Sequence, residues 1–250
     1  MSNNHSTVQQ NITKPIAADP FKVSFKAPKD WINDQGITFR HKPYKKYLRT
    51  DIQTLFATRG VKDPYLEDRE VVARVFPFKV NEHLLDLIDW DHYHFDPLFQ
   101  LTFPQPDMLL PSEIQRLKEC LNKENHHEEL AALISDIRNS KNPAPSNQRA
   151  NRPVILDEDD DEVYECDGLQ HKYKNTVLMF HKNAQTCHSY CTYCFRFNQF
   201  VGKDRFLEET SQRFHTYLSQ HKEISDILIT GGDPATMKAD VFKDMLTPIT

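Results

Sequence analysis

The stretch TVLMFHKNAQTCHSYCTYC, residues 176–194, joins an apolar run directly to a cluster of cysteines. Its first residues form a short continuous apolar segment, which predicts a strand buried on both faces. Three of the five cysteines of this 250-residue chain follow, and Cys187, Cys191 and Cys194 have the spacing C-x3-C-x2-C. The sequence therefore predicts a strand that ends in a loop with three thiols.

A second apolar run, DILIT (226–230), ends in the turn Gly231-Gly232-Asp233-Pro234. Helices are expected between the two runs, from Leu207 to Gln220, and after the second, where Asp240 could cap a helix. Strand, helix, strand and helix in succession predict an α/β fold with a parallel sheet or barrel. Chemistry in such folds sits in the loops at the carboxyl ends of strands, where the cysteines and the glycine turn are both expected.

The rest of the chain divides by composition into a polar tail (1–20), which we expect to be disordered, and a mixed, mostly helical region (21–138). A stretch rich in proline and polar residues predicts a linker (139–167), and the α/β region then spans 168–250. The acidic run DEDDDE (157–162) could bind a cation or be a solvated part of that linker.

Two helix starts are expected within the helical region. Asn81 precedes a segment with leucines at helical spacing, and its side chain suits a helix N-cap. The tetrad Ser112-Glu113-Ile114-Gln115 fits a capping box, in which a serine and a residue three positions later satisfy each other's backbone groups.

Charge and hydropathy exclude several classes of function. The formal net charge is −5 and no basic block occurs, which argues against a nucleic-acid surface. No apolar run approaches the roughly 18 residues of a membrane span, and the first residues lack the apolar core of a signal peptide. We therefore expect a cytoplasmic, reducing location. Clustered thiols there bind metals or act in catalysis more often than they form disulfides.

Thiolates suit both zinc and iron–sulfur clusters. Three cysteines on a four-iron cluster would leave one iron without a protein ligand and free to bind a small molecule. The alternative is a non-catalytic zinc module in which His181 or His188 supplies the fourth ligand. The spacing alone leaves both open.

The two motifs together resemble the radical S-adenosylmethionine superfamily, with Tyr193 as the aromatic residue before the last cysteine and Gly231-Gly232-Asp233 as the second motif. The segments GLQHKYKNTVLMF (168–180) and LLDLIDWDHYHFDPLFQLTFP (84–104) are similar to the lysine 2,3-aminomutase family. This resemblance covers roughly residues 78–250.

The resemblance implies that the three cysteines hold a [4Fe–4S] cluster, and that S-adenosylmethionine binds to its open iron and to the Gly231–Asp233 turn, beside Tyr193. The reduced cluster would generate a 5′-deoxyadenosyl radical for amino-group migration on an amino acid, an isomerase reaction. Arg196 falls where the family holds the substrate carboxylate, a task that suits a guanidinium; the alternative is a salt bridge within the loop.

The implied fold is an N-terminal helical region followed by the first two strand–helix units of a TIM-type barrel. A full barrel takes roughly 200 residues or more, so we expect the chain to be the N-terminal portion of a longer enzyme. The family also uses pyridoxal 5′-phosphate, but its Schiff-base lysine would lie beyond Thr250, and a family arginine near that cofactor falls at Thr176. Implied partners are a small amino acid substrate and an electron donor of flavodoxin or ferredoxin type, and the enzyme could be a homo-oligomer.

Overall fold

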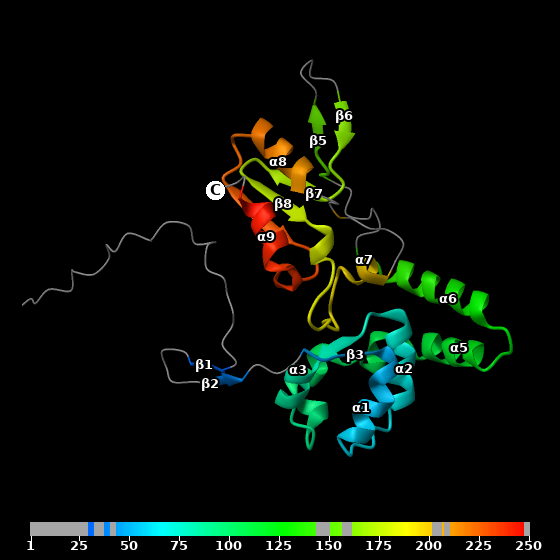
Figure 1. Ribbon diagram of the computed structural model, residues 1–250. Coiled ribbons are helices and arrows are strands. Elements are labelled where there is room, and N and C mark those ends of the chain that lie inside the picture. Colours follow the sequence, from blue (N-terminus) through cyan, green and yellow to red (C-terminus); the bar gives the residue numbers. More distant parts are fainter. Residues whose placement is uncertain are drawn as a thin grey trace, which may run out of the picture. The chain divides into compact units, whose positions relative to one another are not determined.

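The protein is a mixed α/β chain with two compact units, residues 1–43 and 44–250 (Figure 1). The computed structural model describes residues 30–32, 38–40, 44–143, 151–156, 162–201, 207 and 211–247. In the first unit the described residues form an antiparallel pair, β1 (Asp30–Ile32) and β2 (Thr38–Arg40). The tail expected over 1–20 lies outside the described residues, as does most of the acidic run. Within these ranges no helix has both the length and the hydropathy needed to cross a bilayer.

The second unit begins with a helical region around a small antiparallel hairpin. The hairpin strands are β3 (Lys46–Leu48) and β4 (Lys79–Asn81). The helices are α1 (Ile52–Thr58), α2 (Leu66–Val75), α3 (Glu82–Leu87), α4 (Pro97–Thr102), α5 (Pro111–Leu121) and α6 (His127–Ser140). Three short 3-10 helices connect them, η1 (Arg49–Asp51), η2 (Tyr93–Phe95) and η3 (Pro106–Met108).

The two expected helix starts have different outcomes. Asn81 caps α3 as predicted, because its side chain accepts a hydrogen bond from the Leu84 backbone N–H at 2.9 Å. The capping box at Ser112 is wrong: the N-cap is Leu110, two residues earlier, so α5 begins at Pro111, and Glu113 accepts from the Leu110 backbone N–H at 2.7 Å. A proline suits the first helical position because its missing N–H would have no partner there.

Aromatic rings form the centre of the helical region. The Phe56 ring meets four others edge to face at centroid distances of 5.8–6.1 Å, namely Trp90, Tyr93, Phe99 and Phe103. Such arrangements place the positive edge of one ring against the negative face of another. Four rings of the aromatic-rich segment 84–104 therefore belong to the core.

A buried ion pair ties α2 to the end of this aromatic segment. The Arg69 side chain is only 2% exposed, and its Nε donates to the Asp63 carboxylate at 2.5 Å. Its Nη1 also donates to the Pro104 carbonyl at 2.7 Å and to the Gln105 side chain at 2.8 Å. Because both charges are shielded from water, each depends on the other for its stabilisation.

The second half of this unit is the α/β region. Its strands are β5 (Val154–Leu156), β6 (Glu162–Glu165), β7 (Leu169–Tyr173), β8 (Thr176–Phe180) and β9 (Asp226–Thr230). Its helices are α7 (Phe197–Val201), α8 (Ser211–Gln220) and α9 (Ala239–Leu246), with 3-10 helices η4 (Lys182–Ala184) and η5 (Pro234–Thr236). The expected linker stretch thus contains β5 and β6, which pair antiparallel.

The two strands predicted from apolar runs are confirmed, and they pair in parallel, from Thr176 opposite Asp226 to Phe180 opposite Thr230. The antiparallel β7 occupies the other side of β8, which the sequence did not indicate. The cap expected at Asp240 differs, because α9 begins at Ala239 with Lys238 as its N-cap.

Helices cover one face of this three-stranded sheet (Figure 1). Val177 and Met179 of β8 pack with Phe214 of α8 and Met245 of α9 in one buried cluster. Leu228 of β9 points away from this cluster and is 53% exposed. The described residues therefore show an α/β sheet whose second face exposes Leu228; closure into a barrel stays a prediction.

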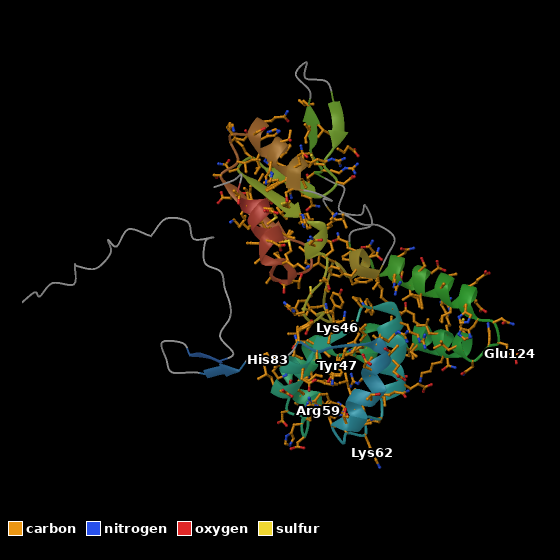
Figure 2. All side chains as sticks on the ribbon, viewed as in Figure 1. Lys46, Tyr47, Arg59, Lys62, His83 and Glu124 are labelled. Atoms are coloured by element: carbon orange, nitrogen blue, oxygen red, sulfur yellow. The ribbon has the colours of Figure 1, made fainter. Side chains whose placement is uncertain are left out.

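The buried Arg69–Asp63 pair gives a test of the helical region. Arg69→Met should lower the free energy of unfolding by roughly 3–5 kcal/mol, because it leaves the Asp63 charge buried without a partner. Arg59→Met is the matched control, since Arg59 forms partly exposed ion pairs with Glu82 and Asp86 and should cost about 1 kcal/mol or less (Figure 2). Urea denaturation measures both; equal losses would contradict the assignment.

Candidate functional site

The carboxyl ends of β8 and β9 lie side by side, since Phe180 pairs with Thr230 at the end of the register. β8 continues through η4 into the cysteine loop, residues 185–196, while β9 continues into the glycine turn, residues 231–233. The chain therefore brings both sequence motifs to one end of the sheet, as the succession of strands predicted.

Backbone hydrogen bonds join the glycine turn to the segment before the first cysteine. The Gly232 N–H donates to the Ala184 carbonyl at 2.7 Å, and the Asp233 N–H donates to the Thr186 carbonyl at 2.8 Å. Gly231 has φ +143°, a conformation that residues with a side chain rarely adopt. A Cβ atom on Gly232 would lie 2.8 Å from the Thr186 nitrogen and closer still to its carbonyl. Both glycines are thus required by the geometry.

The other two residues predicted for cofactor binding differ in their surroundings. The Asp233 carboxylate accepts a hydrogen bond from the Ala235 backbone N–H at 2.9 Å and so caps η5. The Tyr193 side chain is 76% exposed and faces solvent in this chain. The roles of Asp233 and Tyr193 in binding S-adenosylmethionine stay predictions.

Three of the five cysteines lie at this site. Cys120 and Cys166 are buried in separate hydrophobic clusters, whereas Cys187, Cys191 and Cys194 are partly exposed. Burial, with the charges of Cys194, Asp233 and Cys191, raises the pKa of Cys187 to about 11, while Lys79 lowers it. Burial also raises the pKa of Cys194. Three cysteine side chains in one short loop are the ligands that zinc ions and iron–sulfur clusters use.

Both histidines considered as a fourth zinc ligand have contacts with groups other than the thiols. His181 is buried, and its Nδ1 accepts from the Asn183 backbone N–H at 3.1 Å. His188 is exposed and meets the Tyr44 ring edge to face at 5.4 Å. Across the residues that the structure describes, no group of three or more His, Cys, Asp or Glu side chains is arranged around a single metal ion.

Arg196 is the last residue of the cysteine loop and is only 8% exposed. Its guanidinium carbon sits 3.9 Å from the centroid of the Phe180 ring, and its Nε donates to the Gln199 side chain at 3.0 Å. The Nη1 makes a long contact of 3.5 Å with the Gly231 carbonyl, and the buried Nη2 has no hydrogen-bond partner among the described residues. Burial lowers the pKa of Arg196 to about 10, with Cys194 opposing the shift. The salt bridge considered for Arg196 does not form within the described chain.

The helical region also holds the cysteine loop, a feature that the sequence did not reveal. The Tyr190 N–H donates to the Lys79 carbonyl of β4 at 2.9 Å, and the Thr192 N–H donates to the Leu101 carbonyl of α4 at 2.7 Å. The Thr192 hydroxyl adds a bond of 3.0 Å to the Gln100 carbonyl. Backbone pairing of this kind has no residue signature, although the family resemblance of segment 84–104 marked one of the two partners.

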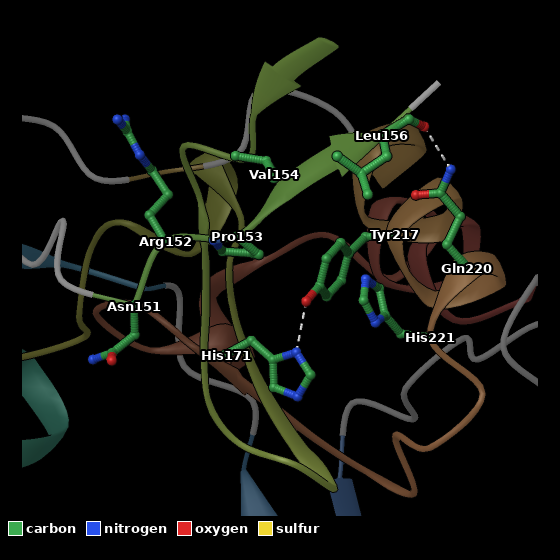
Figure 3. A pocket seen from close by; sticks show the side chains of 9 residues that line it. All are labelled: Asn151, Arg152, Pro153, Val154, Leu156, His171, Tyr217, Gln220 and His221. Carbon is green, nitrogen blue, oxygen red and sulfur yellow. Dashed lines mark hydrogen bonds between the residues drawn. The ribbon is translucent and has the colours of Figure 1, made fainter. Parts of the chain in front are cut away.

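His171 lies away from this site, in a pocket of about 600 Å³ between β5, β7 and α8 (Figure 3). Its Nδ1 is 2.6 Å from the Tyr217 hydroxyl, and its Nε2 is 3.2 Å from the Lys174 carbonyl. A carbonyl can only accept, so Nε2 carries a proton and, in the neutral ring, Nδ1 accepts from Tyr217. His171 therefore has a structural hydrogen-bonding role here.

Comparison with known proteins finds relatives that are named as L-lysine 2,3-aminomutases. The L-lysine 2,3-aminomutase of Methanococcus maripaludis is 24% identical over 199 residues, 78% of this chain and 36% of that protein. The L-lysine 2,3-aminomutase of Escherichia coli K12 is 30% identical over 82 residues, 33% of this chain and 23% of that protein. An Aquifex aeolicus protein that carries the name provisionally is 27% identical over 193 residues, 74% of this chain and 40% of its own length.

The chain thus spans less than half the length of these relatives. No family model matches it, and no solved structure matches it significantly. The three identities, over the extents given, support a distant relationship to lysine 2,3-aminomutases.

The close approach of Gly232 to Thr186 predicts a local effect of a single methyl group. Gly232→Ala should break the turn away from the loop, so the backbone amide hydrogens of residues 232 and 233 should lose hydrogen-exchange protection. Gly60→Ala is the control: Gly60 also has positive φ, +70°, but a Cβ there meets nothing within 4 Å. Retained protection at residue 233 in Gly232→Ala would contradict the packing described.

Proposed function

We propose that this protein is a radical S-adenosylmethionine enzyme of the lysine 2,3-aminomutase kind. In this proposal Cys187, Cys191 and Cys194 hold a [4Fe–4S] cluster, and the reaction moves an amino group on a small amino acid. The observation that carries it is the joining of three free, electrostatically coupled thiols to the glycine turn at the carboxyl ends of two parallel strands. The distant aminomutase relatives support the same interpretation.

The residues present fit such a cluster. Thiolates are its usual ligands, and three of them leave one iron open. Buried polar atoms without partners are rare in folded proteins. Of the four such side-chain atoms found in the described ranges, two belong to the cysteine loop, the Ser189 Oγ and the Arg196 Nη2. Both would gain partners from a group bound at this end of the sheet.

When bound, the cluster would supply the electron that cleaves S-adenosylmethionine to methionine and the 5′-deoxyadenosyl radical. The protein's part is to bind and orient. In our proposal the glycine turn lets backbone approach the methionine end of that molecule closely, since neither Gly231 nor Gly232 carries a side chain. The exposed Tyr193 lies next to the last ligand and would contact the same molecule or a low-potential electron donor.

Arg196 is proposed to bind the carboxylate of the substrate. Its ring contact with Phe180 and its bond to Gln199 fix the guanidinium plane, while Nη2 stays available for a charge-assisted hydrogen bond. A buried cation without an anionic partner is costly, and an incoming carboxylate would offset that cost.

The second face of the sheet, on which Leu228 lies, supports the proposed barrel. Leu228 is exposed, and in a barrel this face would line the interior, where further strands would cover it. Pyridoxal 5′-phosphate gains no support from the described residues, because Thr176, at a family arginine position, carries no charge.

Cluster binding can be tested by single substitutions of the cysteines. After anaerobic reconstitution, Cys187→Ser, Cys191→Ser and Cys194→Ser should each lose most of the iron and the brown colour, because each removes one of three ligands. Cys120→Ala and Cys166→Ala, in buried sites elsewhere, should keep both. Iron retained in all three loop variants would contradict the ligand assignment, and a colourless parent with bound zinc would support the zinc module instead.

The role of Arg196 can be tested with two ligands that differ by one group. Arg196→Met should weaken binding of L-lysine to the reconstituted protein by about ten- to hundredfold, the value of one hydrogen bond to a charged group. Binding of the decarboxylated amine should change little. Arg116→Met, on the exposed face of α5, is the control. Equal losses for both ligands in Arg196→Met would show that Arg196 acts on the fold and not on the carboxylate.

A further inference from the structure

We propose that Lys79 is a positioning residue for the cluster: it fixes the cysteine loop through Thr186 and holds a positive charge beside Cys187. This inference rests on the proposed function and adds a residue from the helical region to the site.

Lys79 contacts the cysteine loop at two points that flank the first cysteine. Its Nζ donates to the Thr186 hydroxyl at 2.9 Å, and its backbone carbonyl accepts from the Tyr190 N–H at 2.9 Å. The Nζ also lies 6.0 Å from the centroid of the Tyr190 ring, at the outer limit of a cation–π contact. Lys79 thus holds the cysteine loop on both sides of Cys187, at Thr186 and at Tyr190.

The strand that carries Lys79 is held by backbone pairing and by burial of the residues on either side. β4 pairs with β3, with Lys79 opposite Leu48, and the neighbouring Phe78 and Val80 are buried in the aromatic core. Successive side chains of a strand point to opposite faces. With Phe78 and Val80 directed into the core, Lys79 is directed to the side where the cysteine loop packs.

Among the described residues, no carboxylate balances the charge of Lys79. The side chain is half-buried, and within this part of the chain no ion pair to an Asp or Glu involves it. Burial lowers the pKa of Lys79, the charge of Lys46 lowers it further, and Cys187 raises it. A partly buried ammonium is stabilised by an opposite charge, and in our proposal the negatively charged cluster held by Cys187 would supply it.

A fixed positive charge at this place would favour the reduced cluster. A four-iron cluster with three thiolates gains one negative charge when it takes one electron from a low-potential donor, and a nearby ammonium stabilises the more negative state more strongly. Lys79 would therefore raise the reduction potential of the cluster as well as hold its loop.

The test is a redox titration of the anaerobically reconstituted protein with dithionite, followed by electron paramagnetic resonance. Lys79→Met should lower the ratio of reduced to oxidised cluster by about tenfold at a fixed potential, a shift of about 59 mV for one electron. Lys79→Arg should stay near the parent. Lys46→Met removes the same charge from an exposed position on the paired strand and should have little effect (Figure 2).

The outcomes separate this inference from the proposed function. A parent protein that takes up no iron would contradict the proposed function itself. A parent with a full cluster and a Lys79→Met variant with the parent's potential would overturn the role of Lys79. If Lys79→Met loses iron, Lys79→Gln serves in its place, because glutamine can still donate to Thr186 without the charge; an unshifted potential there overturns the electrostatic role.

Discussion

The parallel pairing of β8 with β9 is the constraint on which the site depends. It places Phe180 beside Thr230, so that two loops far apart in sequence start next to each other. The bonds from Gly232 to Ala184 and from Asp233 to Thr186 then fix the glycine turn against the cysteine loop. Without that register, the glycine turn and the cysteine loop would not form these hydrogen bonds with each other. The three partly exposed thiols would then have no fixed position beside the turn.

The helical region contributes to the site as well as to stability. Its aromatic core and the buried Arg69–Asp63 pair hold α4 and the residues that follow it. Carbonyl groups of α4 accept hydrogen bonds from the backbone N–H and the hydroxyl of Thr192. β4 receives the backbone of Tyr190 in the same way. The cysteine loop is therefore supported from two directions, by the glycine turn and by the helical region, while its three thiols stay partly exposed.

The sequence predicted those features that depend on local pattern. The apolar runs at 176–180 and 226–230 identified both strands and their pairing, and Asn81 identified the start of α3, because burial and capping leave a local signature. The start of α5 was misplaced, since Pro111 satisfies the same terminus more simply than Ser112. No local pattern encodes contacts between distant segments. Such contacts position the antiparallel β7, the backbone bonds of Tyr190 and Thr192, and the bond from Lys79 to Thr186.

The central claim is that three cysteines hold a cluster with one iron open to S-adenosylmethionine. The most direct measurement is the electron paramagnetic resonance spectrum of the reduced, anaerobically reconstituted protein before and after addition of S-adenosylmethionine. The account predicts a four-iron signal that changes on addition, because the molecule binds an iron that has no protein ligand. A four-iron signal that stays the same at saturating S-adenosylmethionine, or a colourless protein that binds zinc instead of iron, would contradict it.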